Sequence, residues 1–226
     1  MLSFRLKAIV SLVPESETVA DIGCDHGKVA VWLLKNGKAK YAVCGDISGR
    51  SLEKARKLVA SKGLKEAVSL REGSGFDVVD KSEAQTAVVA GMGGELITSI
   101  LEQGRDKLPD TLVLSCNKGS GVLRKWLSEN GFAIEEEDLV LENRHYYPVI
   151  RAKRGESKAL NELELEFGPV LLERKPKLLK YYVNHRIDLT KAIRAKLQKT
   201  KAARKEELLG EIDERLKTYA EVLKCL

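Results

Sequence analysis

The stretch VADIGCDHG (Val19–Gly27), followed by VCGD (Val43–Asp46), decides the fold that the sequence predicts. Its apolar start indicates a buried strand, and its glycines indicate a turn that leads into a helix. Asp46 follows Asp21 by 25 residues and closes the next apolar run. A strand, a glycine turn, a helix and an acid at the end of the second strand are typical of doubly wound α/β sheets that bind adenosine-containing cofactors.

The same alternation continues to about residue 155, where the composition changes. We expect helices over residues 2–13, 28–35, 48–61, 95–103 and 122–129, parallel strands over 18–22, 41–44, 67–70, 87–90 and 112–115, and an antiparallel pair over 132–141 and 146–152. After Gly155, apolar residues recur every three or four positions and predict two antiparallel helices broken near Thr200–Arg204. If the first of these runs from Val170 to Lys199 as one helix, it is about 45 Å long. The sequence therefore predicts an α/β domain over residues 1–155 and an all-α domain over residues 156–226.

Composition excludes several classes of protein. Hydrophobic residues make up 43% of the chain, enough for a buried core and too many for a disordered tail. No apolar run approaches the ~20 residues that cross a bilayer, and the first residues lack the apolar stretch of a signal peptide. Four cysteines without CxxC spacing and three scattered histidines argue against a zinc site or a disulfide framework. We therefore expect a cytoplasmic protein without a bound metal and without a membrane partner.

Positive charge gathers near the carboxyl end of the chain. Residues 157–226 hold 16 Lys and Arg against 11 Asp and Glu, whereas the preceding residues hold 23 against 22. Within Arg186–Lys205 there are eight basic residues and one acid, Asp188. Such a block fits a surface that binds a polyanion, and it equally fits a solvated, lysine-rich helix face. The apolar stripes of this tail could instead pair with a second copy, so we expect a monomer or a weak homodimer.

The acids of the first turn indicate which cofactor binds there. The dinucleotide fingerprint GxGxxG is absent, because Asp25 stands where the second glycine belongs, and the chain contains no Walker sequence. A pyrophosphate needs bare backbone N–H groups, yet here it would face Asp21 and Asp25. These acids suit S-adenosylmethionine, which has a cationic end, while Asp46 can accept both ribose hydroxyls. The alternative is an ordinary α/β turn with incidental acids.

Glycines also follow the third and fourth predicted strands, which end at the same edge of a parallel sheet. Met92, within the second of these turns, could pack on the adenine or belong to the core. The residues that we expect to bind the cofactor are Asp21, Gly23, Cys24, Asp25, His26, Asp46, Ile47, Gly73, Ser74, Gly75, Gly91, Met92 and Gly93.

Four motifs carry a resemblance to a known family. They are DIGxDH from Asp21, AGMGG from Ala90, Asn117 after the fifth strand, and LRxWL from Leu123. Together they resemble the bacterial tRNA (adenine-N1)-methyltransferase family TrmK, described as a class I methyltransferase domain followed by a helical, coiled-coil-like domain. The resemblance runs through essentially the whole chain. It implies a Rossmann-like fold and methyl transfer from S-adenosylmethionine to N1 of adenine 22 in the D-arm of tRNA.

The chain departs from the family pattern at two turns. Relatives tend to have Gly-Asp-Gly where this chain has Gly73-Ser74-Gly75, and Gln-Pro-Asn where it has Ser115-Cys116-Asn117. A carboxylate at position 74 would accept from the adenine amino group, whereas a serine hydroxyl accepts more weakly.

Methylation at N1 makes the base cationic, so a nearby carboxylate would stabilise the product. Our hypothesis for the catalytic residues is Asp25, His26 and Asn117. Asp25 and His26 could instead only hold the cofactor or cap the following helix. Tyr146 and Tyr147 could stack on an extruded base, or be half-buried tyrosines at the sheet edge. The basic residues expected on the RNA backbone are Arg186, Lys191, Arg194, Lys196, Lys199, Lys201, Arg204 and Lys205.

Two other functions stay open at this point. One is a small-molecule methyltransferase with a dimerising helical tail, and the other is a non-catalytic protein that binds S-adenosylmethionine. The basic block favours an RNA substrate over a small one, and a methyl-transfer assay would separate an enzyme from a binding protein.

Overall fold

The computed structural model describes residues 2–200 and 204–226 of the chain. The chain divides into two compact units, Met1–Val170 and Leu171–Leu226. The division into compact units falls after Val170, whereas the sequence led us to expect a domain boundary at residue 155. Residues 156–170 belong to the first unit because the buried Arg124 donates hydrogen bonds to the carbonyl oxygens of Leu165 and Glu166, at 2.9 and 3.1 Å.

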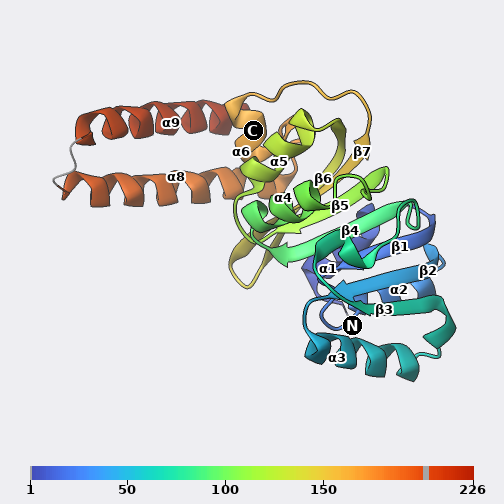
Figure 1. Cartoon of the computed structure of the whole chain (residues 1–226). Helices are drawn as coiled ribbons and strands as arrows, with labels where there is room; N and C mark the ends of the chain where they lie inside the picture. The colour runs from blue at the N-terminus through green and yellow to red at the C-terminus, as the bar shows by residue number, and fades with distance from the viewer. Residues whose placement is uncertain (1, 201–203) are drawn as a thin grey trace. The chain divides into compact units, whose positions relative to one another are not determined.

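One seven-stranded sheet forms the centre of the first unit (Figure 1). Its strands are β1 (Ser16–Ile22), β2 (Ala39–Asp46), β3 (Val68–Glu72), β4 (Thr86–Met92), β5 (Thr111–Cys116), β6 (Phe132–Glu142) and β7 (His145–Arg154). They lie in the order β3-β2-β1-β4-β5-β7-β6, and only β7 runs antiparallel to its neighbours β5 and β6. The predicted parallel sheet with an antiparallel pair at its end is confirmed. The chain order reverses between β1 and β4, which is the place where such sheets bind ligands.

Helices cover both faces of this sheet. Val19 of β1 faces a core shared with α1 (Phe4–Leu12) and α2 (Lys28–Lys35), and α3 (Gly49–Ser61) packs on the same face. The neighbouring Ala20 faces the opposite core, which contains α4 (Gly94–Gln103), α5 (Ser120–Glu129) and the short helix η2 (Gly75–Val78). Successive strand side chains point to opposite faces, so the almost continuous apolar runs of the sequence fill both cores.

Local signals set the helix ends that matter for the site. Of the two serines that could begin α3, Ser48 and Ser51, it is Ser48 that caps the helix, by accepting a hydrogen bond from the backbone N–H of Ser51 at 3.3 Å. Gly27 caps α2 with a positive φ of 64°. Both caps lie directly after a strand of the sheet, so they set the entry of these helices at the carboxyl edge.

The second unit contains an antiparallel helical hairpin, α8 (Lys177–Gln198) and α9 (Lys205–Cys225) (Figure 1). The predicted break between two helices near residue 200 is confirmed. The single helix from Val170 to Lys199 is wrong, because Pro176 disfavours a helical conformation at Lys175, whose φ is +49°. That segment forms α7 (Pro169–Arg174) and α8 instead.

The sequence analysis did not predict α6 (Glu162–Phe167), a short helix that precedes this break. It begins with a capping box, in which the Asn161 side chain accepts from the backbone of Glu164 and the Glu164 carboxylate accepts from the backbone of Asn161. That pattern of Asn followed three residues later by Glu is readable in the sequence. No helix among the described residues is long and apolar enough to cross a membrane.

Candidate active site

The turn between β1 and α2 is tied to the end of β2. The backbone N–H groups of Gly23 and Cys24 both donate to the carbonyl oxygen of Gly45, at 2.8 and 3.0 Å. Gly23 has a φ of +72°, and a Cβ atom there would lie 2.1 Å from the Met92 methyl group. Asp25 also has a positive φ of 45°, which costs an L-residue about 1–2 kcal/mol. Asp adopts this conformation more readily than most residues, and the hydrogen bond from its backbone N–H to Asp46 Oδ2 holds it there.

Asp21 is the most unusual carboxyl group of this edge. Its side chain is buried, and its Oδ2 atom has no hydrogen-bond partner. Burial raises the pKa of Asp21 to about 7; the backbone N–H of Ala30 opposes this shift, and the negative charge of Asp46 adds to it. A cation in the neighbouring cavity would both satisfy the free oxygen and favour its ionised form. The residues present therefore fit the ammonium or sulfonium end of S-adenosylmethionine.

We expect cofactor affinity to depend on pH through Asp21. A cation favours the ionised form of a carboxyl group, so binding of the cofactor lowers the pKa of Asp21. Below pH 7 the Asp21 carboxyl of the free protein is mostly protonated and must lose its proton when the cofactor binds. The dissociation constant of S-adenosylmethionine should therefore rise by about eightfold between pH 7.5 and pH 6. Calorimetric titration of wild type and Asp21→Asn checks this. The variant should show a flat profile over the same range, and an unchanged pH dependence in it would show that Asp21 is not the group responsible.

Asp46 is held in place at the end of β2. Its Oδ1 accepts from the backbone N–H of Ser48 at 2.9 Å, and its Oδ2 accepts from that of Asp25 at 3.0 Å. A carboxylate oxygen has a second lone pair, so both oxygens keep an acceptor for a ribose hydroxyl. The geometry agrees with the ribose-binding role expected from the sequence.

Asp25 and His26 form a short contact between the Asp25 carboxylate and His26 Nδ1. Lys54 of α3 lies 3.7 Å from the other oxygen of Asp25. The Asp25 side chain is 57% exposed, so its charge is partly screened by solvent. Both residues line one cavity with Asp21 and Asp46, and His26 holds the Asp25 carboxylate in one orientation.

A cavity of about 1040 Å³ joins these groups. Of the residues predicted to bind the cofactor, all except Gly93 line it; Gly93 instead caps the N-terminus of α4. The sequence did not predict the other walls, which come from the first helix and from α4; they include Leu2, Ser3, Arg5, Leu6, Leu96, Ser99, Ile100 and Gln103. Ser74 lines the cavity, and its hydroxyl caps nothing in η2.

Asn117 lies beside the cavity rather than in its lining. Its side-chain amide donates to the carbonyl oxygen of Gly91 at 2.7 Å, and its backbone N–H donates to that of Met92 at 2.8 Å. Its Oδ1 accepts from Arg5 Nη1 at 3.1 Å. Asn117 therefore fixes the turn after β4 and has one acceptor directed to α1.

The two tyrosines of the β6–β7 hairpin are half-buried. The Arg5 guanidinium lies over the ring of Tyr147, 4.9 Å from its centroid. Arg5 thus joins Tyr147 to Asn117, a connection that the sequence did not predict. The sequence did contain one indication of this contact: Arg5 is a charged residue within the apolar stripe that contains Leu2, Leu6 and Ile9.

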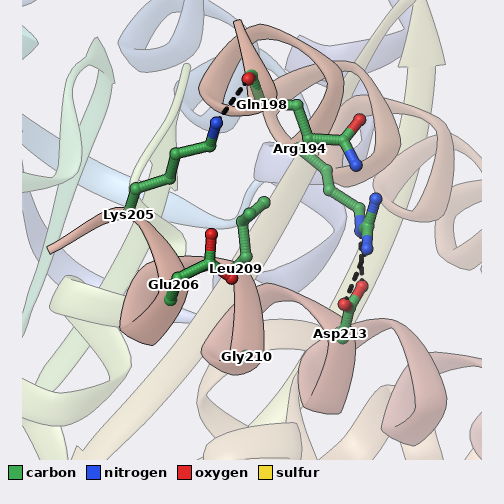
Figure 2. A pocket seen from close by; sticks show the side chains of 7 residues that line it. All are labelled: Arg194, Gln198, Lys205, Glu206, Leu209, Gly210 and Asp213. Carbon is green, nitrogen blue, oxygen red and sulfur yellow. Dashed lines mark hydrogen bonds and ion pairs between the residues drawn. The ribbon is translucent and has the colours of Figure 1, made fainter. Parts of the chain in front are cut away.

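The basic residues of the tail differ in what they contact. Lys191, Lys196 and Lys199 are exposed, and Arg186 is half-buried. A groove of about 590 Å³ lies between α8 and α9. Arg194 pairs with Asp213 there at 2.8 Å, and Lys205 donates to the carbonyl oxygen of Gln198 at 2.6 Å. Figure 2 shows the side chains that line this groove and these two contacts. Arg204 pairs with Glu207 at 2.7 Å. Lys201 lies outside the described residues.

This fold and this site define the chain as an S-adenosylmethionine-dependent methyltransferase of the Rossmann-like class. A family model described as tRNA (adenine(22)-N(1))-methyltransferase matches residues 19–218. The chain belongs to that family.

Named relatives agree with this assignment. The tRNA (adenine(22)-N(1))-methyltransferase of Bacillus subtilis is 30% identical over 98% of this chain and 97% of its own length. The crystal structure of the B. subtilis m1A22 tRNA methyltransferase TrmK matches with a TM-score of 0.90 and 29% identity, covering 99% of both chains. The structure of M. capricolum TrmK in complex with S-adenosylhomocysteine matches with a TM-score of 0.86 and 27% identity, covering 99% of this chain and 98% of the other. The chain is accordingly an enzyme that uses S-adenosylmethionine, and neither a non-catalytic protein nor a small-molecule methyltransferase.

Proposed function

We propose that this enzyme methylates N1 of adenine 22 with a division of labour among the residues described above. Asp46 binds the ribose of S-adenosylmethionine, Asp21 faces its cationic end, and Asp25, His26 and Asn117 act on the acceptor adenine. The observation that carries the proposal is the unpartnered, buried Oδ2 of Asp21 in a cavity lined by acids, which favours a cationic ligand over a phosphate.

Alignment supplies most of the catalysis in this proposal. The bound cofactor supplies an activated methyl group, and adenine N1 has an in-plane lone pair, so no strong base is required. Holding the two reactants in line can supply about 7–11 kcal/mol. In this proposal the Asp25 carboxylate stabilises the positive charge that develops on the base. Asn117 Oδ1, which accepts from Arg5 in the structure, contacts the base edge.

A methyl-transfer assay on unmodified tRNA, followed by nucleoside analysis, tests the reaction. We expect N1-methyladenosine at position 22, and its absence in tRNA with guanine at that position. Another modified base would overturn the assignment. The kinetics of Asp25→Asn test the role of the carboxylate, because near-normal turnover at saturating cofactor would exclude Asp25 as a catalytic group.

We also propose that the α8–α9 hairpin binds the tRNA backbone. The support is the block of basic residues on α8, of which Lys191, Lys196 and Lys199 are exposed. Arg194, Arg204 and Lys205 contact groups of the hairpin itself, so each would exchange an existing partner for a phosphate. The three exposed lysines are therefore the first candidates for phosphate contacts.

Replacing these three lysines by glutamine should weaken tRNA binding and reduce its salt dependence. On a duplex, the slope of log affinity against log salt falls by about 0.9 for each phosphate that the protein no longer neutralises, so we expect a decrease of about 2–3. Binding measured between 50 and 300 mM salt checks this. The control removes the same charge from α9 by replacing the exposed Arg215, Lys217 and Lys224, and it should keep the wild-type slope. Equal slopes in both triple variants would refute a specific role for α8.

We infer that the enzyme works in the cytoplasm as a monomer or a weak homodimer. The cysteines Cys24, Cys44, Cys116 and Cys225 are all free thiols, as a reducing compartment favours. Light scattering tests the oligomeric state, and a dimer that does not dissociate on dilution would contradict this inference.

A further inference from the structure

Arg5 links three separate parts of the first unit at the edge of the cavity. Its Nη1 donates to Asn117 Oδ1 at 3.1 Å, and its guanidinium covers the ring of Tyr147 at 4.9 Å. Its backbone N–H donates to the Glu142 carboxylate at 3.2 Å, near the turn of the same β-hairpin. Arg5 also lines the cavity that contains Asp21. One side chain therefore occupies both the aromatic face and the amide acceptor that the proposed function gives to the adenine.

These contacts leave the guanidinium incompletely satisfied. Arg5 Nε is buried and has no hydrogen-bond partner. A buried donor without an acceptor is unfavourable, whereas a contact with an anion would use the planar fork of the guanidinium fully. The arrangement is therefore one that a ligand with acceptor oxygens improves.

We propose that Arg5 is a positioning residue that exchanges Tyr147 and Asn117 for the phosphate of the target nucleotide. This inference rests on the proposed function of the site. Adenine N1 is on the Watson–Crick edge, so the base must leave its stack before it can react. A purine and a guanidinium compete for the same face of Tyr147. When the base stacks on that face of Tyr147, the Arg5 guanidinium moves to the nearest anion, which is the phosphate of the same target nucleotide.

The same exchange gives Asn117 a part in base selection. Asn117 Nδ2 remains on the Gly91 carbonyl, so the side chain keeps its orientation. Oδ1, released by Arg5, can then accept from the exocyclic amino group next to N1. Guanine has a carbonyl oxygen at that place, which would face Oδ1 as a second acceptor. Arg5 thus keeps this acceptor covered until the correct base replaces it.

Steady-state kinetics of Arg5→Ala, Arg5→Lys and Lys7→Ala test the proposal. Lys7 is on the same helix and does not line the cavity, so its variant is a control for loss of charge. For Arg5→Ala we expect the KM for tRNA to rise about tenfold, as when one hydrogen bond to a charged group is removed. The salt slope of tRNA binding should fall by about 0.7–0.9. Arg5→Lys should have the wild-type salt slope and a KM for tRNA between those of wild type and Arg5→Ala, because lysine keeps the charge but lacks the planar guanidinium.

A structural role would give a different set of results. If Arg5 only fastens α1 to the hairpin, Arg5→Ala lowers the melting temperature while the KM for tRNA and the salt slope stay at the wild-type values, and the proposal is overturned. As a measurement independent of activity, 8-vinyladenine, a fluorescent adenine that keeps the 6-amino group, should brighten at tRNA position 22 in the complex with Tyr147→Leu relative to wild type, because the stacking partner is removed. Equal brightness in both complexes would also overturn it. Failure of the wild-type enzyme to form N1-methyladenosine would instead refute the proposed function.

Discussion

Replacing Arg124 by leucine should lower the free energy of unfolding by about 3–5 kcal/mol. Arg124 is fully buried, and its Nε donates to Glu137 Oε1 at 2.8 Å. The other oxygen of Glu137 accepts from the backbone N–H of Val170 at 3.0 Å. Without the arginine, a carboxylate is left buried without its counter-ion, and the carbonyl oxygens of α6 lose their donor.

Urea denaturation followed by tryptophan fluorescence measures this effect, since Trp32 and Trp126 both belong to the Met1–Val170 unit. The double variant Arg124→Leu with Glu137→Leu should recover most of the stability, because it removes both charges together. Lys125→Leu, the next residue of α5, is the matched control. It breaks an exposed pair with Glu129 and should cost less than about 1 kcal/mol. A loss for Arg124→Leu as small as that of the control would show that the buried pair does not hold α6 in place.

Replacing Asp46 by alanine should raise the dissociation constant of S-adenosylmethionine about 100-fold. Two charge-assisted hydrogen bonds to the ribose contribute on the order of 3 kcal/mol together, which corresponds to that factor. The backbone N–H groups of Asp25 and Ser48 also lose the oxygens that hold the turn. Asp46→Asn keeps one acceptor oxygen and should bind with an intermediate affinity.

Calorimetric titration of S-adenosylmethionine into the free protein gives these constants. The matched control is Glu17→Ala, which removes one exposed carboxylate from the opposite end of the neighbouring strand β1 and should bind as wild type does. A dissociation constant for Asp46→Ala within threefold of wild type would exclude the ribose-binding role.

Most of the first unit was predictable because its signals are local. Alternating apolar runs and glycine turns located β1 to β7 and α1 to α5 within a few residues. The rule that parallel strands end at one edge of a sheet is enough to bring Asp21, Asp46 and the Gly73 turn together. The segment after residue 155 was harder, because helical periodicity continues across Pro176 and conceals the break there.

The parts of the site that the sequence did not reveal depend on packing. That one oxygen of Asp21 is left without a partner follows from the placement of α2 on the sheet, which no spacing predicts. The position of Arg5 over Tyr147 requires α1 and the β6–β7 hairpin to meet, although they are separated by more than a hundred residues. Lining residues contributed by α1 are invisible to motifs for the same reason.

The contacts of Glu137 determine where the chain can be truncated without exposing a buried charge. Glu137 binds Arg124 with one oxygen and the amide of Val170 with the other, so the strand, α5 and the start of α7 are cross-linked by one side chain. A fragment that ends at residue 155 would keep the Arg124–Glu137 ion pair but lose the backbone groups of Leu165, Glu166 and Val170 that contact it. Water would then reach two charges that are buried in the full chain. A fragment that ends after Arg174 retains the carbonyl oxygens of Leu165 and Glu166 and the amide of Val170, so we expect it to keep this buried pair covered.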